Sequence, residues 1–280
     1  MDVDDTSYVL LGLFLAANLL GLSAGIRLYT APAVQQVSSS YQGPVSGAAF
    51  FVLMMVATGI LLLLYRLKNE LVVKIWFNSA LVITALMFFD AFLPSIAALA
   101  FALVLIGARY RTGSFLVRNL SDVIPFAGAG AFFGVVLGLR AAIVLFALLA
   151  VYDYIAVNRT GHMVKLAEQG IESGTMMGFQ YPKEEIGDRP VSGERMEKSG
   201  DKVGMLGGGD VIMPMMLAVS IVPVFGPAAA VSTIAGAATA LFVFLTVIQQ
   251  RDTERFYPAI PVVGSGALFG LVLHLALSLL

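Results

Sequence analysis

Stretches of about 20 mainly apolar residues, each long enough to cross the hydrocarbon core of a bilayer, follow one another along most of the chain. Only 12% of the residues are charged, about half the share in a typical soluble domain. The sequence therefore predicts an all-α, polytopic membrane protein with nine transmembrane helices. The predicted helices are 7–29, 47–65, 71–89, 93–108, 122–139, 141–157, 205–225, 227–248 and 259–280.

One long polar stretch, 158–202, interrupts this pattern. It mixes acidic and basic residues with Gly and Pro, and it holds too little apolar surface to order itself. We expect a flexible cytoplasmic loop there. The loop divides one membrane domain into helices 1 to 6 in residues 1–157 and helices 7 to 9 in residues 203–280.

Basic residues mark one side of the predicted topology. When the nine segments cross the membrane alternately, all but two of the 17 Lys and Arg residues fall on the side of the N-terminus, the exceptions being Arg27 and Arg140. Cytoplasmic loops carry such an excess of positive charge. The chain is predicted to be a multi-pass protein of the cell membrane, with its N-terminus in the cytoplasm and its C-terminus outside.

Composition excludes several classes of chemistry. The chain has no cysteine and two histidines, which excludes disulfides, thiolate nucleophiles and histidine-rich metal cages. The net charge of −1 gives no basic field for nucleic acid, so we predict no nucleic-acid partner, no metal and no cofactor. His274 is predicted to be a neutral packing or hydrogen-bonding residue.

Two aspartates stand within apolar surroundings, where ionisable groups usually mark function. Asp153 lies near the end of the sixth predicted helix, and Asp210 lies near the start of the seventh. These helices are consecutive and antiparallel, so both carboxyl groups can meet at one level near the cytoplasmic face. Asp122, in contrast, is predicted to be an interfacial cap at the start of the fifth helix.

Paired carboxylates favour a specific chemistry. Two such groups in one site cannot both ionise, so one can take a proton from water while the other donates to a peptide carbonyl. The predicted function is hydrolysis of peptide bonds within transmembrane helices. An ion channel or proton-coupled carrier using the same aspartates is the alternative, and a non-catalytic scaffold is a third reading.

Two further features flank the aspartates on the cytoplasmic side. A glycine run directly before Asp210 removes three side chains and lets another backbone come close. Pro258 and Pro261 withhold amide donors at the start of the last helix and fix an extended segment. We hypothesise that residues before Gly207, together with 258–261, offer a backbone edge to an unwound substrate.

Taken together, three motifs resemble those of the presenilin and signal peptide peptidase family, the GxGD intramembrane aspartyl proteases, and most closely its archaeal presenilin homologues. The motifs are Tyr152-Asp153, Gly207-Gly208-Gly209-Asp210 and Pro258-Ala259-Ile260-Pro261. The resemblance implies transmembrane peptides or proteins as substrates in the lipid bilayer. It also implies the nine-helix architecture.

Carried over by position, Asp153 and Asp210 are the implied catalytic pair. Gly207 and Gly209 match the motif glycines, and Pro258-Ala259-Ile260 matches an element that lines the site and helps to hold substrate. Ile260 departs from the family leucine by a β-branch. Neighbouring motif residues complete the predicted substrate-binding set: Tyr152, Gly208 and Pro261.

Small residues at four-residue spacing predict close helix packing. They are Gly130, Gly134 and Gly138 in the fifth predicted helix, and Gly266 and Gly270 in the ninth.

Overall fold

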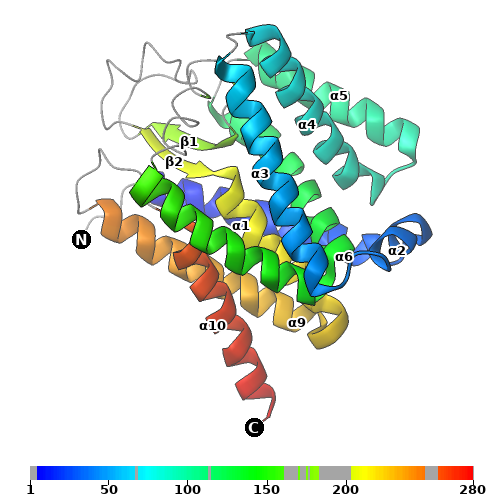
Figure 1. Ribbon diagram of the computed structural model, residues 1–280, viewed down its shortest axis with the longest axis vertical. Helices are drawn as coiled ribbons and strands as arrows, with labels where there is room; N and C mark the ends of the chain where they lie inside the picture. Colours follow the sequence, from blue (N-terminus) through cyan, green and yellow to red (C-terminus); the bar gives the residue numbers. More distant parts are fainter. Residues whose placement is uncertain are drawn as a thin grey trace.

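Helices make up most of the computed structural model, which describes residues 5–66, 69–112, 115–160, 170, 175, 177–182, 203–249 and 258–279. The predicted all-α class is confirmed apart from one hairpin. Figure 1 shows the helices gathered into a bundle with the two strands at its edge. The elements are α1 (Asp5–Leu28), α2 (Pro32–Ser38), α3 (Pro44–Arg66), α4 (Glu70–Asp90), α5 (Ser95–Thr112), α6 (Phe115–Ile155), η1 (Ala156–Thr160), β1 (Gly178–Pro182), β2 (Val203–Gly207), α9 (Gly208–Gln249) and α10 (Ile260–Ser278).

Six helices of the described chain are long and apolar enough to cross a membrane, and Ser95–Arg109 is a shorter apolar helix. The predicted count of nine is not confirmed. It differs because 122–139 and most of 141–157 lie in one continuous element, α6, while most of 205–225 and 227–248 lies in α9. The six are Thr6–Leu28, Pro44–Arg66, Leu71–Asp90, Leu116–Ile155, Gly208–Val247 and Ile260–Leu277.

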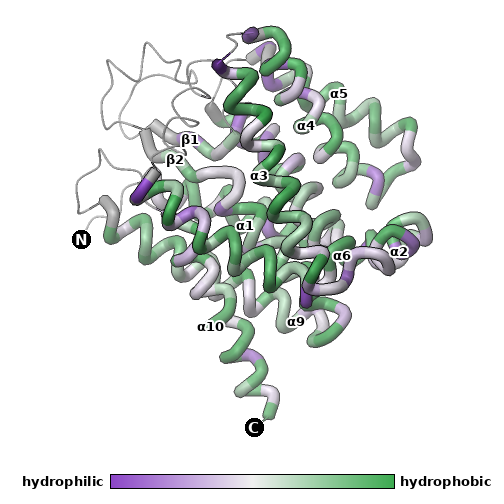
Figure 2. The backbone as a smooth tube through the Cα atoms, viewed as in Figure 1, coloured by the Kyte–Doolittle hydropathy of each residue, from purple (hydrophilic) through white to green (hydrophobic). Residues whose placement is uncertain are grey.

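The outer surface of the bundle is apolar. Ile96 is 88% exposed and Val45 is 79% exposed, and Figure 2 shows hydrophobic colouring along most of the helical tube. A water-soluble protein of this size rarely exposes so much contiguous apolar surface. The surface fits a protein whose helices are surrounded by lipid.

The long helix α9 reverses direction at Gly226, which has a φ of 82° and is not helical. Before this glycine, Val219 accepts a hydrogen bond from the Tyr29 hydroxyl just beyond the end of α1. After it, the ring of Phe242 lies 5.9 Å from that of Tyr8 near the start of α1. The second half of α9 therefore runs back along α1, as the ribbon in Figure 1 shows.

The helix α6 also kinks, at Gly138, with a φ of 62°. Before the kink, the Phe126 ring packs against Gly208 at the start of α9. After the kink, Asp153 lies within electrostatic range of Asp210, in the same turn of α9 as Gly208. Both halves of α6 thus lie beside the start of α9.

Close packing at most of the predicted small residues is confirmed. Gly130 lies against the Met215 side chain, and Gly134 leaves a Cβ position only 2.7 Å from Cβ of Val219. Gly266 and Gly270 both pack on α9 around Gly236. Gly138 lies in the kink of α6, where a Cβ would be 3.3 Å from Cγ of Gln42, in the segment between α2 and α3 and not in another helix.

An antiparallel hairpin replaces part of the predicted loop and the start of the seventh predicted helix. β1 pairs with β2 with Gln180 opposite Met205, so a helix beginning at 205 was wrong, and α9 begins at Gly208. Glycines disfavour helix, and 178–182 supplies the strand partner. Within 158–202, the residues other than 158–160, 170, 175 and 177–182 lie outside the described chain.

The prediction of Asp122 as an interfacial helix cap was also wrong. α6 begins seven residues earlier at Phe115, and Asp122 is fully buried and forms an ion pair with Arg109 of α5. The guanidinium also lies 5.5 Å from the centre of the Phe77 ring on α4. Three helices are therefore joined by one buried charged group, which stays buried because its counterion is there.

Candidate active site

Asp153 is the third residue from the end of α6, and it is buried. Its Oδ2 atom accepts a hydrogen bond of 3.3 Å from the backbone N–H of Ile260. Ile260 is the first residue of α10, and first-turn N–H groups have no partner within their own helix. The start of α10 thus supplies a donor to the carboxylate at the end of α6.

Asp210 lies in the first turn of α9. Its carboxylate receives a hydrogen bond from the backbone of Gly207 and lies within electrostatic range of Asp153. The ends of α6, α9 and α10 therefore bring together both aspartates, one glycine of the run and the backbone of Ile260. The two carboxyl groups lie at one level, although they are 57 residues apart in the chain.

Each of the three glycines before Asp210 has a different environment. A Cβ added to Gly207 would lie 3.0 Å from Oδ2 of Asp210, and one added to Gly208 would lie 2.9 Å from two carbons of the Phe126 ring. Gly209 is exposed, and its nearest neighbour would be Cδ1 of Ile260 at 4.0 Å. Gly207 leaves room for the carboxylate, Gly208 for the α6 ring, and Gly209 keeps an open surface.

The Pro258 to Pro261 segment lies directly at the site. Ala259 is the N-cap of α10, and Pro261 lies in its first turn. Pro258 is half-buried, whereas the Ile260 side chain is 8% exposed and packs with Leu149 of α6 in one hydrophobic cluster. This burial fixes the direction of the backbone donor toward Asp153.

Tyr152 is turned toward another helix. Its ring packs edge-on against Phe51 of α3, with 6.0 Å between the ring centres. Of the predicted site residues, Tyr152 and Gly208 therefore make ring contacts with α3 and α6, while the aspartates, Gly207 and Ile260 come together.

Two supporting residues of α6 were missed by the sequence analysis. Asn119 hydrogen-bonds to the backbone of β1 at Gln180, and Phe126 packs against Phe179, with 5.3 Å between the ring centres. Neither residue stands out, because a polar residue near a helix end and an apolar residue within a helix are both ordinary. Only the pairing of β1 with β2 brings them near the site.

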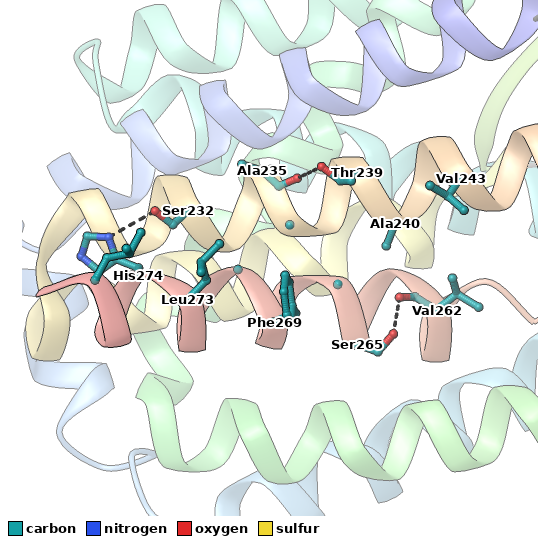
Figure 3. A pocket seen from close by; sticks show the side chains of 14 residues that line it. Ser232, Ala235, Thr239, Ala240, Val243, Val262, Ser265, Phe269, Leu273 and His274 are labelled. Atoms are coloured by element: carbon teal, nitrogen blue, oxygen red, sulfur yellow. Dashed lines mark hydrogen bonds between the residues drawn. The ribbon is translucent and has the colours of Figure 1, made fainter. Parts of the chain in front are cut away.

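A separate groove of about 740 Å³ runs between α9 and α10. Figure 3 shows that it is lined by small and apolar side chains, with His274 at one end hydrogen-bonded to Ser232. The Ser232 Oγ to His274 Nδ1 distance is 3.2 Å, so the predicted hydrogen-bonding role of His274 is confirmed. In the part of the chain that is described, no three or more His, Cys, Asp or Glu residues could hold a metal ion together.

Solved structures share this arrangement of helices. Two structures described as a presenilin family intramembrane aspartate protease, in the C222 and P2 space groups, each match with a TM-score of 0.65. Their sequence identities are 23% and 24%; both matches cover 96% of this chain, and they cover 96% and 98% of the other chains. The overall fold is therefore that of an intramembrane aspartate protease.

The sequence also matches a family model over residues 11–278, that of the signal-peptide peptidase, presenilin aspartyl protease family. Because this match spans almost the whole chain, the protein belongs to that family, whose members are hydrolases. A search of curated individual proteins found no match.

Proposed function

We propose that the protein hydrolyses peptide bonds within transmembrane helices, with Asp153 and Asp210 as its catalytic pair. The observation that carries the proposal is the meeting of these two carboxyl groups at the ends of α6 and α9. One ionised carboxylate takes a proton from the attacking water, and its protonated partner donates to the carbonyl oxygen of the scissile bond. The Ile260 N–H orients the Asp153 carboxylate for this exchange.

Substrate binding is proposed for the glycine and proline motifs. Gly209 is the open glycine beside Asp210, and Pro258 to Pro261 forms the facing wall. β2 leads directly into Gly208, and its outer edge can pair with an unwound substrate segment by β-augmentation. This supports the hypothesis of a backbone edge before Gly207. Tyr152 acts on substrate binding indirectly, through the contact of its ring with Phe51 of α3.

Helix length supports a nine-crossing topology. The apolar part of α6 spans 40 residues, as does that of α9, which at 1.5 Å per residue is about twice the bilayer core. Each element reverses at a non-helical glycine and so crosses the membrane twice. With α5 as a further crossing, the two ends of the chain lie on opposite sides of the membrane. The excess of basic residues on the side of the N-terminus indicates that this end lies in the cytoplasm and the C-terminus outside, in a protein of the cell membrane.

The alternative of an ion channel or carrier has no support in the family match or in the similar structures. The proposed function is tested by incubating purified protein in micelles with a labelled transmembrane peptide and measuring the products by mass spectrometry. Asp153→Asn and Asp210→Asn should each lower turnover by about 10²–10⁴-fold, the usual contribution of a positioned acid or base.

Asp90→Asn is the matched control, because Asp90 is an exposed aspartate whose carboxylate accepts a hydrogen bond of 2.9 Å from Ser95. It should cleave like the parent protein. Circular dichroism checks that all variants keep their helices. Normal cleavage by either Asp153→Asn or Asp210→Asn would overturn the proposed mechanism.

A further inference from the structure

We infer that Asn119 is a positioning residue that closes one edge of the hairpin, so that an unwound substrate can pair only with β2. The inference rests on the proposed proteolytic function. Asn119 is 3% exposed, and its Nδ2 donates to the carbonyl of Gln180 at 2.7 Å. The N–H of Gln180 donates in turn to Oδ1 at 3.0 Å. One buried side chain thus takes both backbone groups of one strand residue.

These bonds define which way the backbone of β1 faces. An N–H that donates to Asn119 does not donate to β2, so the pair of Gln180 and Met205 is a non-hydrogen-bonded pair. The alternation of an antiparallel ladder then assigns the ladder hydrogen bonds to the pair of Phe179 and Leu206 and to the pair of Tyr181 and Gly204. The Gly208 N–H, which donates to Met177 at 3.2 Å, follows the same alternation.

The outer edge of β1 is closed at successive outward positions. Gln180 is occupied by Asn119, and Pro182 has no N–H to offer. Such features prevent a further strand from adding to an edge. The backbone of Met205, at the matching outward position of β2, faces the opposite way and lies five residues before Asp210.

We call the two hydrogen bonds between Asn119 and the backbone of Gln180 the clamp. The clamp is rigid because α6 holds β1 at two points. Asn119 and Phe126 are seven residues apart, two helical turns, and therefore lie on one face of α6. Phe126 packs against the fully buried Phe179 and against Gly208. The position of β2 relative to Asp210 is thus set from α6, and with it the register in which a substrate strand presents its peptide bonds.

Three substitutions test the clamp. Asn119→Leu keeps the branching at Cγ but replaces both hydrogen-bonding groups of the amide with methyl groups. Gln180→Pro removes the N–H that donates to Asn119, together with the side chain, and leaves the ladder bonds, since Pro182 already occupies an equivalent outward position in β1. Gln180→Ala is the matched control, because it removes the side chain and keeps the backbone N–H.

The first measurement is hydrogen exchange in micelles without substrate. Asn119→Leu and Gln180→Pro should raise the exchange rates of the Phe179 and Leu206 ladder amides by at least about tenfold, the cost of leaving buried groups unpaired. Gln180→Ala should leave them near the parent rates. Unchanged exchange in both clamp variants would overturn the inference, and because two different residues are altered, misfolding of one variant leaves the other to decide.

The second measurement is the distribution of cleavage positions in a transmembrane peptide. The clamp variants should spread cleavage over neighbouring bonds, whereas Gln180→Ala should keep the parent pattern. Raised exchange with an unchanged product pattern would show a merely structural clamp and overturn the positioning role. If the parent protein cleaves no peptide, the proposed function fails, and the exchange result still decides whether Asn119 holds β1.

Discussion

Gly208 and Gly209 are adjacent glycines whose replacement by alanine should have opposite effects on stability. In Gly208→Ala the new Cβ would lie 2.9 Å from two carbons of the Phe126 ring, so ring or helix must shift by roughly 0.5 Å, and overpacking of this kind costs about 1–3 kcal/mol. In Gly209→Ala the nearest atom lies at 4.0 Å, so the variant keeps the alanine gain in a helix of about 0.5–1 kcal/mol. Because the alanine gain applies to both variants, they should differ by the overpacking cost, roughly 1–3 kcal/mol in free energy of unfolding.

The assay is unfolding by SDS titrated into non-ionic micelles, followed by helical circular dichroism. Phe126→Leu should partly rescue Gly208→Ala, with a coupling energy of about 0.5–3 kcal/mol in a double-mutant cycle. Gly209→Ala, although more stable, should cleave more slowly because its methyl group enters the open surface beside Asp210. Equal stabilities of the two alanine variants, or a coupling near zero, would refute the assignment of Gly208 to the Phe126 contact.

Three further changes follow from the packing. Gly207→Ala places a Cβ 3.0 Å from Oδ2 of Asp210; displacing that carboxylate by a few tenths of an ångström should lower kcat by about tenfold while KM changes little, measured in peptide-cleavage kinetics. Arg109→Ala should destabilise the fold by about 3–5 kcal/mol, because it leaves the buried Asp122 carboxylate unpaired, and Arg109→Met with Asp122→Leu should recover most of that loss in the SDS titration. Gly226→Ala should cost about 1–3 kcal/mol from its backbone conformation alone, with φ 82° and ψ 170°, since no atom lies within 4 Å of the new methyl group; an unchanged SDS midpoint would contradict this.

The apolar segments and the two aspartates were predictable because each signal is local. An apolar run of helical length needs no partner to be recognised, and a carboxyl group is conspicuous within one. The level at which Asp153 and Asp210 meet also follows from two consecutive antiparallel helices. The boundaries within α6 and α9 were not fixed in this way, because a reversal at a single glycine leaves hydropathy almost unchanged on both sides.

The hairpin and the buried ion pair could not be read from the sequence. Residues 203–207 form a strand only because 178–182 lies alongside, and the intervening stretch has no pattern that fixes its partner. Asp122 follows Ser121 at a place typical of a helix cap. Its full burial is tolerable only because it forms an ion pair with Arg109 of α5. Both features depend on contacts between segments that are separate in the chain.

The structure gives the proline motif a more definite role than the sequence pattern predicts. Pro258 and Pro261 lack N–H donors, and the N–H of Ile260 between them donates to Asp153. The predicted extended segment was wrong, because Ala259 is in the αR conformation and α10 begins at Ile260. The motif instead presents the N–H of Ile260 to one carboxylate. A leucine at this position would carry the same backbone N–H, so the departure from the family pattern changes only the side chain, whose Cδ1 lies near Gly209. The difference between isoleucine and leucine should thus affect which substrate side chains fit beside Gly209, and not the hydrogen bond that orients Asp153.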